Sequence, residues 1–578
     1  MLNSYPLNSL PLNSLPPSGG EEPDIDTVVI SPGASFAWTL QVLLGGVDVT
    51  DQLTGTVRIE CAEDGDSVAT FALWLGDGPV DALGYTGRPV SIDFIVSGDP
   101  AISSRRFTGS LVQPTFDVVT RVLTCEATTR LADTVEAMAI PAIDALVGGL
   151  WSDDVFEPVA GRSRWDYAQE RLSTRPASLS ADRDGNPRIS PWHQSGVHWE
   201  FAPGSTLYDS VDVSLATLSE TTNVVELELD YRYSRYRQRN QSYSWVNPIT
   251  GGNMSINGFI AWKADSTELP DIEMIVGAVD SAGWFLTSAT WYRLPGDITE
   301  GPGSPWYNKN TALLLGADFK AAVRWTQRAV EQYRLTLEIP DAVAAVGPVI
   351  RRDRVVLDTD TEADRIWEDG QTVLDGEGVP EQQPITGLPR RAQARLNRAA
   401  TCARNRACVQ LLAAQRGNTV SWQMPLAHAL GVDAGHRVRM LDQGVTATGT
   451  VVSAVDEVDT ATGSALLTLT IAVSRGTAEA ISSPLTTPPA PTFTDVPGPT
   501  ISGTLPTQLS KVWDDPPYDP ELPGFAGAHS IGTWNPENRY PRRFAIDTPE
   551  IPDQWRDEIT AARTATYSVA PPVDALEV

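Results

Sequence analysis

The chain has 578 residues, more than one hydrophobic core can hold, so several domains are expected. Its 43 basic and 73 acidic residues give a net charge of −30, which argues against a surface built to neutralise nucleic-acid phosphates. Four scattered cysteines cannot form a disulfide scaffold, and we expect them to be buried as small apolar residues. No apolar run is long enough to cross a membrane, and residues 1–20 lack the basic start and apolar core of a signal peptide.

Residues 1–24 open with a five-residue repeat in which Leu-Asn-Ser recurs at Leu2, Leu7 and Leu12. The intervening prolines forbid a regular helix or a central strand. Two interpretations remain open. The segment is either a flexible leader or an extended arm that becomes ordered against a neighbouring subunit through the regularly spaced leucines.

Residues 25–130 have the pattern of a small β-barrel or sandwich. Short apolar runs alternate with Gly, Asp and Pro, and they predict six strands at Phe36–Leu44, Gly55–Cys61, Val68–Leu75, Pro89–Val96, Phe107–Val112 and Val122–Ala127.

Residues 131–220 indicate a small α+β domain. Leu131–Leu150 is rich in Ala and Leu and is predicted to be helical, and Ser163–Leu172 is a helix opened by an N-cap serine. A hairpin follows, with strands at Ala177–Ser180 and Arg188–Trp192. Its turn, Asp182–Asn186, superficially resembles a calcium loop, but the ligand spacing is wrong and a hairpin turn explains it.

Apolar and charged residues alternate strictly over Val224–Tyr233, which predicts an amphipathic strand. Residues 240–389 form a Trp-rich insertion in which we expect a helix near Ala317–Tyr333. Strands are predicted again at Thr419–Pro425, Arg437–Asp442, Val445–Val455 and Ala465–Ser474. Residues 476–578 hold 17 of the 44 prolines and are expected to be extended and laid on other surfaces.

A long helix is predicted over residues 390–418, because apolar residues recur there every three or four positions. Its seven arginines have no acidic residue among them. The helix is therefore either a contact with an acidic neighbour or a solvated or internally paired face. The candidate subunit-contact residues are Arg391, Arg395, Arg398 and Arg404 of this helix, together with Leu2, Leu7 and Leu12 of the arm.

No catalytic, cofactor-binding or metal-binding site is predicted. His193 and His198 lack the spacing of a helical zinc pair, and a structural role is favoured for both. Tyr231, Tyr233, Tyr236 and Tyr243 alternate with arginines as in a stacking platform for single-stranded nucleic acid, although strand periodicity is the simpler explanation. Motifs of hydrolases and nucleotide-binding loops do not occur.

Three stretches of the sequence follow one another in a specific order. They are Gly46–Thr50 with Gly55–Ile59, Tyr85–Val90, Phe107–Gly109 and Pro114–Asp117; then Trp165–Tyr167 through Asp184–Asn186 to Trp192; then the basic helix with Val438–Met440, Ala447–Val452 and Leu467–Ser474. Taken in this order, they resemble the baseplate hub (central tail-tip) proteins of long-tailed bacteriophages. The resemblance covers roughly residues 25–235 and 390–475, about half of the chain, and its specificity lies in the order of the stretches.

The resemblance implies a structural, non-enzymatic virion protein with no cofactor, a homotrimer that closes the tail tube at the tail tip and forms part of the DNA ejection channel. Its implied partners are further copies of itself, distal tail or tube proteins, the tape-measure protein and tail fibre or tip proteins, with DNA only in transit and assembly in the host cytoplasm. The alternatives are a distal tail or fibre-attachment protein and a tail-associated cell-wall or glycan hydrolase.

The expected fold is therefore mainly β with α+β parts, multidomain, with two small β-barrel-like domains. The units are an extended arm (1–24), a first β-barrel-like domain (25–130), an α+β domain (131–220), a second β-barrel-like domain (221–239 and 419–475), an insertion (240–389), a long basic helix (390–418) and a Pro-rich extension (476–578).

Overall fold

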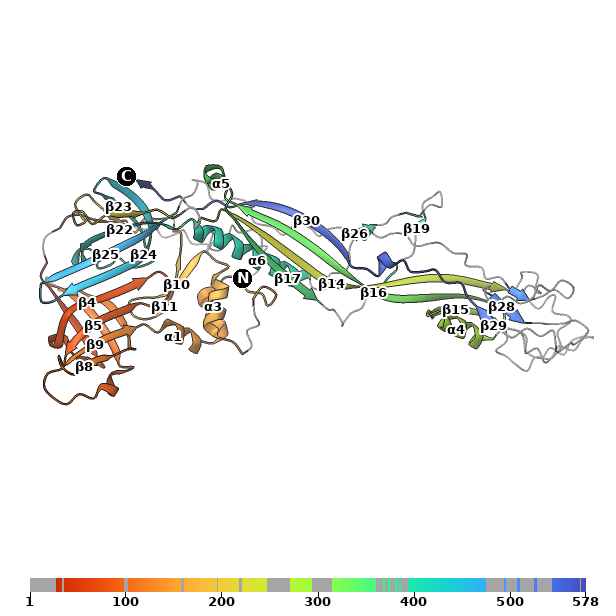
Figure 1. Ribbon diagram of the computed structural model, residues 1–578, viewed down its shortest axis with the longest axis horizontal. Coiled ribbons are helices and arrows are strands. Elements are labelled where there is room, and N and C mark those ends of the chain that lie inside the picture. Colours follow the sequence, from red (N-terminus) through yellow and green to blue (C-terminus); the bar gives the residue numbers. More distant parts are fainter. Residues whose placement is uncertain are drawn as a thin grey trace, which may run out of the picture.

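The computed structural model of the chain describes residues 27–33, 36–97, 102–156, 161–194, 196–217, 221–246, 271–293, 314–359, 367–369, 373–374, 380–381, 384–385, 393–474, 493–494, 507–509, 524–527, 543–571 and 573–578. The molecule is elongated, with a β-rich head at one end and a long sheet that extends away from it (Figure 1). The expected N-terminal arm lies outside the described residues.

The head is one sheet of 16 strands, and two parts of the chain contribute eight strands each. The first β unit contains β2 (Trp38–Leu44), β3 (Val47–Asp48), β4 (Leu53–Ala62), β5 (Val68–Trp74), β6 (Pro89–Val96), β7 (Ile102–Leu111), β8 (Thr115–Asp117) and β9 (Val122–Thr128). The second β unit contains β1 (Val28–Ile30), β12 (Trp199–Phe201), β13 (Asp212–Ser214), β22 (Asn418–Pro425), β23 (Arg437–Asp442), β24 (Val445–Asp459), β25 (Ser464–Val473) and β31 (Leu576–Glu577).

Strand β24 joins the two units. Its first part, residues 445–450, pairs with β23, and residues 453–459 pair with β4 of the first unit. The register against β25 shifts between Val451 and Ser453, at the changeover. A single apolar core runs through both units, so they are packed as one body.

The mainly β, multidomain fold and the strands predicted for both units are confirmed. Within the described residues, however, neither unit closes into a complete barrel, because the strand pairings branch at β24 and never return to form a ring. We expected residues 221–239 and 419–475 to form one domain. This prediction is wrong, since the strand formed by the first segment belongs to a different sheet.

The predicted α+β region packs beside the head (Figure 1). Ser163 caps its third helix, because its hydroxyl accepts a hydrogen bond from the Asp166 amide. The predicted hairpin is present, and Gly185 takes the positive φ that its turn requires. The elements are α1 (Leu131–Ala137), α2 (Ile140–Val147), α3 (Arg164–Leu172), β10 (Ala177–Ala181) and β11 (Pro187–Pro191).

The arm sheet extends from the head and is built on two very long antiparallel strands, β14 and β16. The expected helix near Ala317–Tyr333 is wrong, because these residues lie in β16. Alanines suggest a helix there, but Phe319, Tyr333 and their neighbours alternate at period two and pack on one face. The strands are β14 (Val224–Val246), β15 (Phe285–Arg293), β16 (Leu314–Glu338), β17 (Ile350–Thr359), β18 (Trp367–Asp369) and β30 (Ile559–Ser568).

The predicted basic helix is present as α6 (Gln393–Ala414), and its apolar side packs on the head-proximal half of the arm sheet. Helix α4 (Ile272–Ser281) packs on the distal half. The remaining elements are α5 (Pro340–Val346), β19 (Val373–Leu374), β20 (Pro380–Glu381), β21 (Pro384–Ile385), β26 (Phe493–Thr494), β27 (Thr507–Leu509), β28 (Gly524–Gly527), β29 (Arg543–Ala545) and the short 3-10 turns Thr50–Gln52, Ala82–Tyr85, Leu426–His428 and Asp553–Trp555.

The C-terminal strap, residues 543–571 and 573–578, runs from the arm back to the head (Figure 1). Within it, β30 pairs in parallel with β16, and β31 then pairs with β24 of the second β unit. This part of the Pro-rich extension is extended, as expected, and it pairs with strands of the same chain.

Candidate functional site

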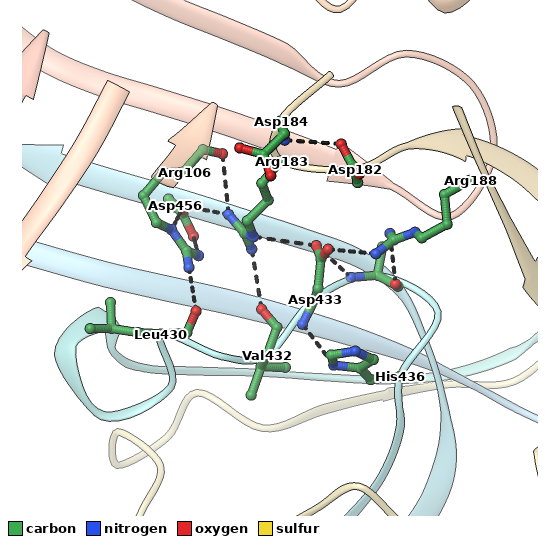
Figure 2. Close-up of polar contacts among 11 residues, drawn as sticks. Arg106, Asp182, Arg183, Asp184, Arg188, Leu430, Val432, Asp433, His436 and Asp456 are labelled. Atoms are coloured by element: carbon green, nitrogen blue, oxygen red, sulfur yellow. Dashed lines mark hydrogen bonds and ion pairs between the residues drawn. The ribbon is translucent and has the colours of Figure 1, made fainter. Parts of the chain in front are cut away.

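A buried ionic network lies where the two β units and the α+β hairpin meet (Figure 2). Arg106 of β7 donates two hydrogen bonds of 2.7 Å to the Asp456 carboxylate of β24, and a third bond of 2.8 Å to the Leu430 carbonyl. Both charged side chains are 1% exposed. Because each half of the pair comes from a different β unit, the contact fixes how the two units sit against each other.

The α+β hairpin adds two more arginines to this buried ionic network, which we call the junction network: Arg183 from its turn and Arg188 from its second strand. Arg183 lies 3.4 Å from both Asp456 and Asp433, and it donates to the Val432 carbonyl. Arg188 of β11 donates to Asp433 at 2.7 Å. Three arginines therefore surround two carboxylates, and they join the hairpin to both β units (Figure 2).

Burial and the arginines act in opposite directions on the pKa of Asp433, one of the two acids of the junction network. Burial tends to raise the pKa of Asp433, but the guanidinium groups of Arg183 and Arg188 outweigh it and hold that pKa below its usual value. Asp433 is therefore ionised at neutral pH. The junction network holds the two β units and the hairpin together, since both of its acids are paired with arginines and neither is exposed to bind a substrate.

Sequence reasoning missed the junction network. One signal was present, because Asp456 alternates with Ala454 and Val458 on the buried face of its strand, where an acid requires a partner. Arg106 gave no such signal. A register shift between Ile92 and Asp93 buries both Arg106 and Phe107, which breaks the alternation.

The candidate contact residues of α6 lie in different environments. Arg395 is bound within the chain, because its guanidinium makes a bidentate contact with Asp154, whose side chain is 3% exposed. Arg404 is buried and hydrogen-bonds Tyr567 of the strap. Arg398 is exposed and has no ion-pair partner within the part of the chain that the structure describes.

Arg391 and the arm leucines Leu2, Leu7 and Leu12 lie outside the described residues. Arg395 is thus internally paired, which was one of the alternatives left open for this helix. The acid that pairs with it is 241 positions away, and local sequence cannot show such a partner. Just beyond α6, Arg416 similarly binds Glu63 of the first β unit at 2.8 Å.

The alternative sites considered from sequence find no support in the described residues. Tyr231, Tyr243 and Arg237 are buried, so they cannot form a platform for stacked bases. Asp182 accepts from the Asp184 and Asn186 amides, as a hairpin turn requires. The described residues contain no group of three potential metal ligands and no helix able to span a membrane. All four cysteines are free and buried, as expected.

No protein-family model matches the chain, and no curated protein matches it. Some solved structures are similar. The 43 kDa tail protein of prophage MuSo2 from Shewanella oneidensis has 11% identity and a TM-score of 0.34, over 75% of this chain and 97% of that one. A tail protein from Neisseria meningitidis MC58 has 10% identity and a TM-score of 0.35, over 75% and 96%.

The E. coli c3393 protein, a component of the type VI secretion system described as structurally similar to T4 bacteriophage tail proteins gp27 and gp5, has 8% identity and a TM-score of 0.27, over 75% of this chain and 77% of that one. These neighbours are tail proteins and a secretion component similar to them. The likeness is distant, and by itself it assigns no function to this chain.

Proposed function

We propose that the chain is a structural protein of a bacteriophage tail tip, the trimeric hub that closes the end of the tail tube. In this role it joins the tube to fibre or tip proteins and forms part of the DNA ejection channel. Its partners are further copies of itself, distal tail or tube proteins, the tape-measure protein and tail fibre or tip proteins. The role is structural, not catalytic, in the virion, after assembly in the host cytoplasm.

The observation that carries this proposal is the pair of eight-stranded β units joined in one chain. Three chains with two such units each would present six β units around an axis, which suits a junction with a six-fold tube. That use requires the two units to keep a fixed relative position. The shared strand β24, the common core and the buried Arg106–Asp456 pair supply the rigidity.

The acidic charge fits a channel for DNA in transit. A net charge of −30 offers DNA phosphates little counterion-release gain, so a passing polyanion would not adhere. Arg398 is the exposed basic residue of α6 best placed to meet an acidic neighbour, because Arg395 and Arg404 already have partners inside the chain.

The test is the mass of the purified full-length protein in solution, measured by native mass spectrometry and analytical ultracentrifugation. We expect a particle of three chains. A ring of six chains would instead indicate a distal tail protein, and a stable monomer would overturn the hub proposal. A zymogram on peptidoglycan and lipopolysaccharide tests the remaining alternative, since lytic activity from the pure protein would indicate a hydrolase.

A further inference from the structure

Three of the five histidines gather at one seam of the head. His193 and His198 lie between the α+β hairpin and β12, and His436 lies in the loop before β23. The imidazole rings of His198 and His436 stack with centroids 5.0 Å apart and an interplanar angle of 16°. The strap ends beside them, because Arg437 binds Asp574 at 2.9 Å. Three parts of the chain therefore meet at this histidine seam.

All three imidazoles accept a hydrogen bond at Nδ1. His436 accepts from the Asp433 amide at 3.2 Å, and His198 accepts from the Arg437 amide at 3.2 Å. His193 Nδ1 lies 3.3 Å from an Arg437 guanidinium nitrogen, which can only donate. An imidazolium has no acceptor nitrogen, so the seam as built requires the neutral form of each ring.

The charges around the histidine seam oppose protonation. His436 faces Asp433, His198, Arg188 and Arg183, and both arginines repel a positive ring. His193 faces Arg437, whose backbone amide also contacts His198. The Arg437 guanidinium faces Asp574, and Asp574 also lies near Arg416. Burial, together with these cations, lowers the pKa of His436 to about 4 despite the opposing effect of Asp433. Burial and Arg437 lower the pKa of His193 to about 4.

We propose that the histidine seam is an acid-sensitive joint. Protonation of its imidazoles releases the strap end and the α+β hairpin from the second β unit, while the strands of the first β unit stay paired. The inference stands on the geometry of the single chain and does not depend on the hub proposal.

The release follows from the contacts that protonation removes. The Asp433 and Arg437 amides lose their acceptors, and a cationic His193 repels the guanidinium that holds Asp574. The pKa values of His193 and His436 are lower in the closed seam than the ordinary value of about 6.5, so the closed seam is fully favoured above that pH and loses stability as the pH falls towards about 4. Over this range the opening constant should rise about tenfold per pH unit for each of these two histidines.

Hydrogen exchange of the full-length protein, corrected for intrinsic rates, tests the proposal between pH 7 and pH 4.5. We expect peptides covering residues 192–199, 433–438 and 573–578 to lose protection as the pH falls, while β5, β6 and β9 keep theirs. The double variant His193→Asn and His436→Asn replaces the two imidazoles of lowered pKa by side chains whose acceptor oxygen does not titrate, and it should flatten the transition at the seam.

The matched control is His428→Asn, the same substitution at a histidine outside the seam, which should leave the transition unchanged. A seam whose protection does not change with pH, or one that opens equally in the double variant, would overturn the proposal. If the double variant does not fold, histidine NMR of the wild-type protein decides. We expect His436 to titrate far below 6.5, and titration near 6.5 with an intact seam would refute the joint.

Discussion

The head and the arm solve the problem of covering a sheet in opposite ways. In the head, two β units bury their apolar faces in one continuous core and are also joined by the buried junction network. In the arm, one long face of β14 and β16 is covered by three separate pieces. Helix α6 covers the first part, Trp555 of the strap covers the middle and α4 covers the distal part.

The difference teaches where cooperativity should lie. A perturbation in the head core or in the junction network reaches both β units, because they have no independent cores. A perturbation of one arm cover should stay local, since α6 and α4 belong to different apolar clusters. The following predictions test this contrast.

The largest effect is expected from Asp456→Asn. Removing the charge leaves Arg106 and Arg183 without their shared carboxylate in a buried site. We expect the free energy of unfolding of the head to fall by about 3–5 kcal/mol. Urea unfolding followed by probes in both β units should show one shifted transition. The control is the next residue, Glu457→Gln, whose exposed pair with Arg58 should change stability by about 1 kcal/mol or less. Separate shifts of the two units would contradict the single-body head.

A large but local effect is expected from Trp555→Ala. This side chain stacks on Trp325 at 5.9 Å and lies against the guanidinium groups of Arg237 and Arg239. Its loss should destabilise docking of the strap by about 3 kcal/mol. Hydrogen exchange should show faster opening of β30 with unchanged protection in β5 and β9. If the head loses protection equally, the arm is not an independent unit of stability.

A moderate effect is expected from Arg395→Ala, because it leaves Asp154 buried without its cation. We expect a loss of about 1–3 kcal/mol, seen as a lower melting temperature. Arg395→Lys keeps the charge and should recover part of the loss. An unchanged melting temperature for Arg395→Ala would show that the ion pair does not contribute to stability.

The smallest effect on stability is expected from Arg398→Glu, since this exposed residue has no ion-pair partner among the described residues. Its melting temperature should match that of the wild type. If α6 meets an acidic neighbour, the variant should form fewer multi-chain particles in native mass spectrometry. Full assembly would mean that this part of the helix is a solvated face.

Local pattern was sufficient for most elements. The strands of both β units follow from period-two alternation, the Ser163 cap from helix-capping chemistry and α6 from its apolar spacing. Long-range partners were beyond it. The pairings of β24 with β4 and of Arg395 with Asp154 join residues hundreds of positions apart, and only the folded chain brings them together. The helix wrongly expected in β16 shows the same limit, because its alanines are small enough for both structures.

The strap completes two sheets whose other strands come earlier in the sequence. Leu576 and Glu577 are translated after the strands of both sheets, yet these residues pair with β24 in the head, and Trp555 fills a site in the arm. Until the strap has been translated, the edge of β24 that β31 pairs with and the part of β16 that β30 and Trp555 cover lie open. A chain truncated before the strap would therefore lack both closures.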